Sequence, residues 1–167
     1  MTVCFTGHRK LPQNHEKKLR TLLMKETENR ILSGASIFRT GGALGFDTLA
    51  ALTVLRLKKK YPDIRLELIL PCPTQTKYWE KKDILLYEKI KASATSFRYI
   101  SPVYYNGVLQ MRNRCLVDGS DVCIAYLCTS HGSGSAFTCA YALSKGVELV
   151  NLADSLPSMP LDEASDF

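Results

Sequence analysis

Short runs of β-branched and apolar residues alternate along the chain with longer segments in which apolar residues recur every three or four positions. The first pattern is typical of buried strands, and the second of helices that pack one face on a core. The runs predict strands at residues 2–6, 36–40, 64–70, 96–100, 122–127 and 148–152. The segments between them predict helices at residues 14–32, 47–60, 77 or 79 to 92, 108–117 and 136–145.

Strands that are apolar on both faces and alternate with helices are typical of a parallel sheet covered by helices on each side. We therefore expect a single Rossmann-like, three-layer α/β domain over residues 1–153, with a mostly parallel sheet of about five to six strands. Residues 154–167 hold two prolines and four acidic residues, which predicts an acidic, loose C-terminal tail.

Local signals place some of the helix boundaries. Asn14 and Asp47 are polar residues of the kind that cap helix N-termini, so we expect them to begin the first and second helices. Gly34 is expected to end the first helix. Trp79, the sole tryptophan, is expected on the third helix.

Composition narrows the class of protein. The 167 residues are 46% hydrophobic and 23% charged, which suits a globular domain with a core. No stretch approaches the roughly 18 apolar residues of a membrane-spanning helix, and no secretory signal opens the chain, so we expect a cytoplasmic protein without a membrane partner. The six cysteines form no C-x-x-C pair, which favours buried thiols and predicts no metal site.

Charge is distributed unevenly along the chain. Residues 1–60 hold 12 Lys/Arg and 4 Asp/Glu, and residues 61–115 hold 9 and 5, so these two parts have net charges of +8 and +4. Residues 116–167 hold 1 and 7, a net charge of −6, which brings the total to +6. A basic front and an acidic end suit a protein that attracts a phosphate-bearing ligand on one side.

Candidate ligand-binding residues follow the predicted strands. Glycines, small hydroxyl residues and arginines occur at Thr6–Arg9, at 40–47, at 130–135 and in the helix segment 111–114. In parallel α/β sheets the carboxyl ends of the strands meet at one edge, where ligands bind. Glycines let backbone N–H groups approach a phosphate, and helices that begin near Asp47 and residue 136 add the positive end of a dipole.

Each of these residues also has a structural interpretation. The Gly-Gly-x-x-Gly loop at 41–45 is also compatible with a simple tight turn, and Asp47 with an N-cap rather than a catalytic acid. His8 suits a ligand contact or a turn equally well. Arg112 and Arg114 are two positions apart on a helix, so only one of them needs to face a site. Trp79 suits the core as well as a base-binding pocket.

The motifs taken together resemble a known family. Thr6-Gly7-His8-Arg9, the GGALGFD loop at 41–47, Gln75, Trp79 and Met-Arg-Asn-Arg at 111–114 are similar to the YpsA-like family of the SLOG superfamily. The resemblance covers about residues 2–152 and implies a Rossmann-like fold that binds a nucleotide-type ligand. It also implies kinship with phosphoribohydrolases of the cytokinin-activating type and with the DNA-processing protein DprA.

The resemblance does not extend to the catalytic glutamate of the phosphoribohydrolases. Met111 and Arg114 match the helix element of those enzymes, and residues 134–138 (GSAFT) resemble their Gly-rich loop. The segment 136–142 (AFTCAYA) holds no carboxylate, however, and hydrolysis through an oxocarbenium-like centre requires one or an equivalent group. Asp47 or Asp118 would have to substitute, and both suit structural roles, an N-cap and a polar helix end. Cys139 as a nucleophile would need His8 or His131 as a base. We therefore expect a binding protein rather than an enzyme.

The favoured function is that of a cytoplasmic sensor that binds a nucleotide or an ADP-ribose-like derivative, with no further cofactor. The alternatives are a nucleotide-processing enzyme of phosphoribohydrolase type without the usual glutamate, and a DprA-like binder of single-stranded nucleic acid. A protein partner and a homo-oligomer both stay open. The residues expected to bind the ligand are Thr6, Gly7, His8, Arg9, Gly41, Gly42, Gly45, Asp47, Gln75, Trp79, Arg112, Asn113, Arg114, Ser133, Gly134, Ser135 and Thr138.

Overall fold

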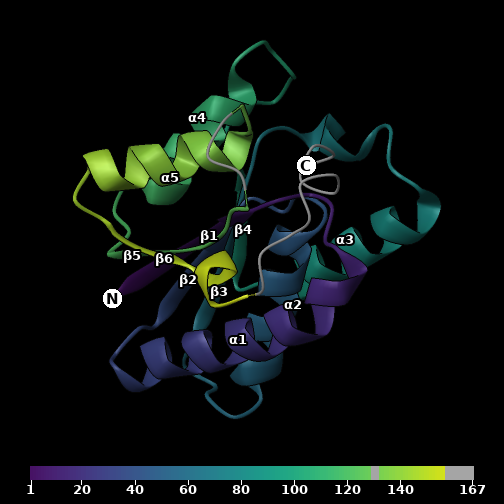
Figure 1. Cartoon of the computed structure of the whole chain (residues 1–167). Coiled ribbons are helices and arrows are strands. Elements are labelled where there is room, and N and C mark those ends of the chain that lie inside the picture. The colour runs from purple at the N-terminus through teal and green to yellow at the C-terminus, as the bar shows by residue number, and fades with distance from the viewer. Residues whose placement is uncertain (129–131, 157–167) are drawn as a thin grey trace.

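The computed structural model describes residues 1–128 and 132–156 and shows a six-stranded parallel sheet between two layers of helices (Figure 1). This confirms the predicted Rossmann-like three-layer architecture. The strands are β1 (Thr2–Gly7), β2 (Ile37–Thr40), β3 (Arg65–Leu70), β4 (Ser96–Tyr99), β5 (Val122–Tyr126) and β6 (Glu148–Asn151). The helices are α1 (Gln13–Leu32), α2 (Phe46–Lys58), α3 (Lys81–Ser93), α4 (Val108–Val117) and α5 (Gly134–Ser144), with short 3-10 turns η1 (Pro73–Thr76) and η2 (Leu152–Ser155).

The strand order of the sheet is β4-β3-β2-β1-β5-β6. Strands β2 to β4 are added on one side of β1, and β5 and β6 on the other, so the order reverses between β1 and β5. The register pairs Val3 with Val122 and Gly7 with Tyr126, which brings the ends of these two strands level. Such a reversal opens a crevice at the carboxyl ends of the two neighbouring strands. The fold therefore marks the ends of β1 and β5 as the place for a ligand.

The two faces of the sheet have separate cores. Helices α1, α2 and α3 cover one face, where Leu19, Phe38 and Val54 belong to the larger apolar cluster (Figure 1). Helices α4 and α5 cover the other face, where Cys4, Leu116 and Ala142 belong to the smaller one. Both faces of β1 and β5 are buried, which explains why these strands read as continuous apolar runs.

Three predicted boundaries were wrong. Asn14 does not cap α1, because Pro12 holds the N-cap position in an extended conformation and its carbonyl accepts the His15 N–H at 3.1 Å. Asp47 does not cap α2 either: Gly45 is the N-cap and Asp47 lies in the first turn.

The third error concerns Trp79, which precedes α3 instead of lying on it. The η1 turn ends at Thr76, and Glu80 is extended at the N-cap of the helix, so the helical pattern restarts only at Lys81. The Trp79 ring meets the Tyr87 ring edge to face, with 5.6 Å between centroids, and so joins the core side of α3. Residues 157–167 of the predicted tail lie outside the described residues.

No helix in the described part of the chain is both long and apolar enough to cross a membrane. The same part of the chain holds no group of three or more His, Cys, Asp or Glu side chains arranged to bind a metal ion. Four of the six thiols, those of Cys4, Cys72, Cys123 and Cys139, are buried.

Candidate functional site: a cleft between β1 and β5

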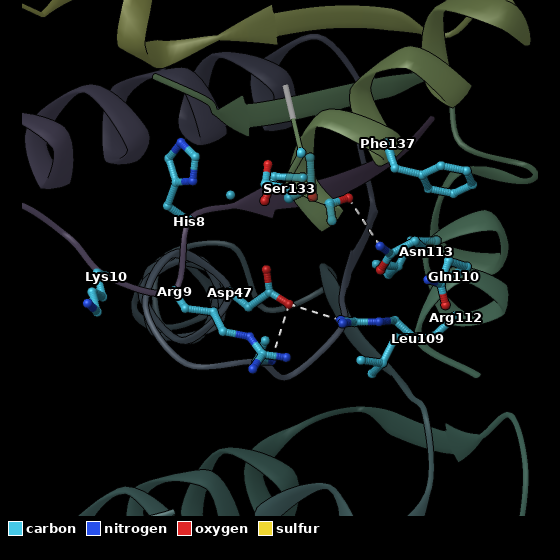
Figure 2. A pocket seen from close by; sticks show the side chains of 17 residues that line it. His8, Arg9, Lys10, Asp47, Leu109, Gln110, Arg112, Asn113, Ser133 and Phe137 are labelled. Carbon is cyan, nitrogen blue, oxygen red and sulfur yellow. Dashed lines mark hydrogen bonds and ion pairs between the residues drawn. The ribbon is translucent and has the colours of Figure 1, made fainter. Parts of the chain in front are cut away.

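A cleft of about 550 Å³ opens where β1 and β5 end (Figure 2). Its walls come from the segment after β1, the first turn of α2, one side of α4 and the start of α5. A cleft of this size lies within the range of small-ligand sites. The lining residues are Thr6, Gly7, His8, Arg9, Lys10, Ala43, Asp47, Leu109, Gln110, Arg112, Asn113, Leu116, Gly132, Ser133, Gly134, Ser135 and Phe137.

The segment after β1 combines a buried imidazole with two exposed cations. His8 is 3% exposed, and its Nε2 accepts the backbone N–H of Cys128 at 2.9 Å. Burial lowers the pKa of His8 below its ordinary value, so the neutral ring is favoured. Arg9 and Lys10 follow it and are exposed at the edge of the cleft. Exposed cations at the edge of a cleft attract an anion without the desolvation cost of a buried cation.

The start of α5 forms the opposite wall. Ser133 is the N-cap, and its hydroxyl oxygen accepts the N–H of Ala136 at 3.1 Å. Asn113 on α4 donates from Nδ2 to the carbonyl of Gly134 at 3.2 Å, which ties α4 to the helix start (Figure 2). The first amides of a helix have no partner within the helix, so the N–H groups of Gly134 and Ser135 present donors and a positive dipole end at this wall.

A buried ion pair lies on the floor of the cleft. Arg112 donates from Nη1 to Oδ2 of Asp47 at 3.3 Å, and the side chains are 8% and 6% exposed. The same Oδ2 accepts the backbone N–H of Ala43 at 3.2 Å. Burial raises the pKa of the Asp47 carboxyl, while the Arg112 guanidinium and the loop amides favour its charged form. The pair therefore joins α4 to the first turn of α2, and the Ala43 hydrogen bond ties the same carboxylate to the preceding loop.

The glycines of this loop are explained by close packing. A Cβ at Gly41 would overlap Nη1 of Arg112, and a Cβ at Gly45 would overlap the carbonyl oxygen of Arg9. Gly45 also has a φ of +75°, which favours glycine. The first amide of α2, Phe46 N–H, donates to the His8 carbonyl at 3.1 Å. This bond ties the start of α2 to the segment after β1.

The structure separates the predicted site residues into two groups. Ten of them line the cleft: Thr6, Gly7, His8, Arg9, Asp47, Arg112, Asn113, Ser133, Gly134 and Ser135. The others lie outside its lining: Gly41, Gly42, Gly45, Gln75, Trp79, Arg114 and Thr138.

The residues outside the lining have structural partners. Gln75 donates from Nε2 to the carbonyl of Gly42 at 2.8 Å and so supports the loop from behind. The Arg114 guanidinium lies over the rings of Phe137 and Tyr141, at 5.7 and 5.9 Å from their centroids. Thr138 donates its hydroxyl to the Gly134 carbonyl at 2.8 Å.

Sequence reasoning missed the apolar side of the cleft, which Leu109, Leu116 and Phe137 form with Gln110 beside them. The signal was present, because Leu109 precedes Asn113 by four positions on α4 and therefore lies on the same helix face. Sequence reasoning also missed Lys10, which follows Arg9 and lines the cleft with it.

Cys139 does not have the features of a nucleophile. Burial raises its pKa to about 11, so the thiolate is scarce near neutral pH. Of its two predicted base partners, His8 is a buried acceptor for a backbone amide and His131 lies outside the described residues.

A family model named YpsA, described as the YspA SLOG family, matches residues 3–146. The chain belongs to this family. The match confirms the resemblance expected from the motifs at Thr6–Arg9 and 41–47, and it spans every residue that lines the cleft.

Several curated members of UPF0398 are similar to parts of the chain. A UPF0398 protein of Brevibacillus brevis is 36% identical over 85 residues, which are 48% of this chain and 44% of that protein. A UPF0398 protein of Halalkalibacterium halodurans is 31% identical over 114 residues, which are 65% and 60% of the two chains. UPF0398 protein YpsA of Bacillus subtilis is 28% identical over 109 residues, covering 59% and 58%. The chain thus spans less than two thirds of the length of these relatives.

Two solved structures share the fold. DNA processing protein A from Helicobacter pylori, described for its single-stranded DNA binding mode, has a TM-score of 0.63 and 22% identity over 89% of this chain and 63% of that chain. The protein TM1055 has a TM-score of 0.56 and 16% identity over 96% and 82%. At these identities the likeness shows the fold alone.

Proposed function

We propose that the chain binds a nucleotide or a nucleotide derivative in the β1–β5 cleft and acts as a binding protein. The observation that supports this most is the start of α5, where the amides of Gly134 and Ser135 and the positive helix end face the exposed cations Arg9 and Lys10 across the cleft. Backbone donors and cations around one cavity are the features that bind phosphate.

The rest of the cleft suits the nucleoside part of such a ligand. Leu109 and Phe137 offer an apolar side, and the amide of Gln110 lies beside them. In this proposal the phosphate binds between Arg9 and the start of α5, and the ring system lies toward Phe137. Membership in the SLOG family supports a nucleotide-type ligand.

A binding role is favoured over turnover by the chemistry of the cleft. Its one carboxylate among the described lining residues is Asp47, which is already engaged by Arg112 and the Ala43 amide. A carboxylate held in this way stabilises the loop and is a poor general acid or base.

The test is a thermal-shift panel of the full chain with AMP, GMP, ADP-ribose and inorganic phosphate, followed by recovery of the ligand. A ligand at about 100 times its Kd stabilises by about 2.7 kcal/mol, which raises Tm by about 5–10 °C in a chain of this size. Arg9→Ala should reduce the shift, and Arg114→Ala, outside the cleft, should not. Recovery of intact nucleotide supports binding. Release of free base or ribose phosphate would point to turnover, and no shift with any ligand would contradict the proposal.

Single-stranded nucleic acid is a second candidate, favoured by exposed tyrosines. Tyr104 and Tyr105, in the segment between β4 and α4, are 63% and 42% exposed, and α4 continues from there to the cleft lining. Exposed aromatic rings stack on bases, and DNA processing protein A, which shares the fold, is described as binding single-stranded DNA. Under this alternative an oligonucleotide binds steeply less well as salt rises, and Tyr104→Ala weakens it.

A further inference from the structure

The two edges of the sheet differ in how open they are. An edge strand presents unpaired N–H and C=O groups that can pair with a strand of another chain. At the β6 edge only Glu148 is exposed, and its carboxylate is bound by Arg30 at 2.7 Å. At the β4 edge Ser96, Phe97 and Arg98 are all exposed. The β4 edge is therefore the more accessible of the two.

The hydrogen bonds between β3 and β4 determine which backbone groups point outward. Ile100, directly after β4, donates its N–H to the Leu70 carbonyl at 2.8 Å, so the backbone of Leu70 faces β4. Leu68, two positions earlier on β3, faces the same way and lies opposite Phe97 in the register. In a parallel ladder a residue bonds to the two neighbours of the residue opposite it. The N–H and C=O of Phe97 therefore point away from the sheet.

The side chain of Phe97 adds an aromatic surface at the same position. It is 48% exposed, and its ring meets the Tyr99 ring edge to face with 5.7 Å between centroids. Lys91 of α3 lies over the Phe97 ring, 5.6 Å from the centroid, and is bound by Glu88 at 2.9 Å, so its charge is balanced. Outward backbone groups beside an exposed aromatic ring are the features that stabilise strand pairing.

We propose that two copies of the chain pair through β4 in antiparallel orientation, with Phe97 directly opposite Phe97 of the second copy. The two residues exchange both of their outward N–H···O=C bonds, and their rings meet on one face of the sheet. The two six-stranded sheets then form one sheet of twelve strands. A two-fold axis between the two phenylalanines relates the copies, which is the commonest symmetry of protein dimers.

The charge of Arg98 favours this register over its neighbours. Antiparallel pairing with outward groups matched can be centred on Phe97, Arg98 or Tyr99. A centre at Arg98 places two guanidinium groups directly opposite each other, which is unfavourable. A centre at Tyr99 pairs β4 with residues beyond its last one. A centre at Phe97 places each Arg98 opposite Ser96, which is small and neutral.

This association is independent of what the cleft binds. Strands β2 and β3 lie between β4 and the β1–β5 cleft. A two-fold axis perpendicular to the sheet also turns the carboxyl ends of the second sheet to the opposite edge. Both clefts therefore stay open in the dimer.

The test is sedimentation velocity of the full chain from about 5 to about 500 µM. Because the paired strands are short, we expect a weak dimer with a Kd of about 10–100 µM. Phe97→Lys and Phe97→Glu should each stay monomeric, since two like charges would meet at the axis. An equimolar mixture of the two variants should dimerise again, because opposite charges then face each other. Leu143→Lys, at a 61% exposed apolar position on α5, is the matched control and should dimerise as the wild type does.

A wild type that stays monomeric at about 500 µM would overturn the proposal. A dimer that survives in Phe97→Lys alone, or a mixture that fails to associate, would overturn it as well. Amide exchange of the wild type followed by NMR tests the same contact without a substitution. Raising the concentration from about 20 to about 500 µM should slow exchange of the Phe97 N–H and leave that of Arg98, which faces β3, unchanged. Exchange at Phe97 that does not depend on concentration would contradict the pairing.

Discussion

Replacing Arg112 with methionine would leave the Asp47 carboxylate buried without its cation. Methionine keeps most of the aliphatic stem, so the change removes charge more than packing. At 3.3 Å and an effective dielectric constant of about 20, the attraction is about 5 kcal/mol. Breaking a buried pair by removing one partner costs about 3–5 kcal/mol. We expect Arg112→Met to lower the free energy of unfolding by about 3–4 kcal/mol and Tm by about 10 °C.

The loss of unfolding free energy in Arg112→Met should depend on pH. Burial already raises the pKa of Asp47, and loss of Arg112 removes an interaction that favours the charged carboxylate, so the pKa rises further in the variant. A carboxyl whose folded pKa lies above its unfolded value of about 3.9 destabilises the fold at neutral pH, and proton uptake relieves that cost as the pH falls. The gap between variant and wild type should therefore be widest near neutral pH and narrow toward about pH 4.

Chemical denaturation of both proteins at about pH 7 and about pH 4.5 measures this difference. Arg114→Met is the control: it lies two residues along α4, is exposed, and contacts only ring faces among the interactions of the described residues, so its cost should stay within about 1 kcal/mol. A deficit for Arg112→Met below about 1 kcal/mol, or one equal at both pH values, would refute the role assigned to the pair.

Three further predictions concern the surroundings of the cleft. Gly45→Ala should lower the free energy of unfolding by about 3 kcal/mol or more, and Gly146→Ala by only about 1 kcal/mol, as followed by thermal unfolding. Both glycines have a positive φ, but only Gly45 lacks space for a Cβ. Equal losses in the two variants would contradict the packing argument. The folded pKa of His8 is lowered, so wild-type stability should fall as the pH drops below about 6.5, and His8→Gln should lack this component when Tm is followed against pH. Cys139 should resist alkylation in the native protein at about pH 8, and rapid labelling seen by mass spectrometry would refute its buried, protonated state.

The layers of the fold could be predicted because strands buried on both faces differ sharply in pattern from amphipathic helices. Helix α4 was predicted with its observed bounds, Val108–Val117. The helix starts were less predictable, because capping depends on backbone geometry that propensity does not fix. At α1 the preceding Pro12 supplied the extended conformation and the carbonyl that Asn14 was expected to provide.

The candidate site could be predicted for those residues whose place in the fold follows from their position directly after a strand or at a helix start. Residues directly after β1 and at the start of α5 must lie at the strand ends, and the structure brings them to one cleft. Ion pairs between residues far apart in the sequence could not be predicted from the sequence. The Asp47–Arg112 pair joins residues that are 65 positions apart, and it shows that the glycine loop holds a buried salt bridge. The sequence also could not show which of Arg112 and Arg114 faces the cleft, because this depends on how α4 packs on the sheet.

The most direct test of the cleft as a nucleotide site is isothermal titration of the full chain with AMP and ADP-ribose, comparing wild type with Gly134→Asp and Gly134→Asn. A Cβ at Gly134 meets nothing closer than Asn113 Nδ2 at 3.6 Å, so the backbone position accepts a Cβ. Asn and Asp are nearly equal in size, so the comparison of the two variants isolates the negative charge. The account predicts that the wild type and Gly134→Asn bind at least one of the two ligands and that Gly134→Asp loses at least about tenfold in affinity. Equal affinity in all three proteins, or no binding by the wild type, would contradict it.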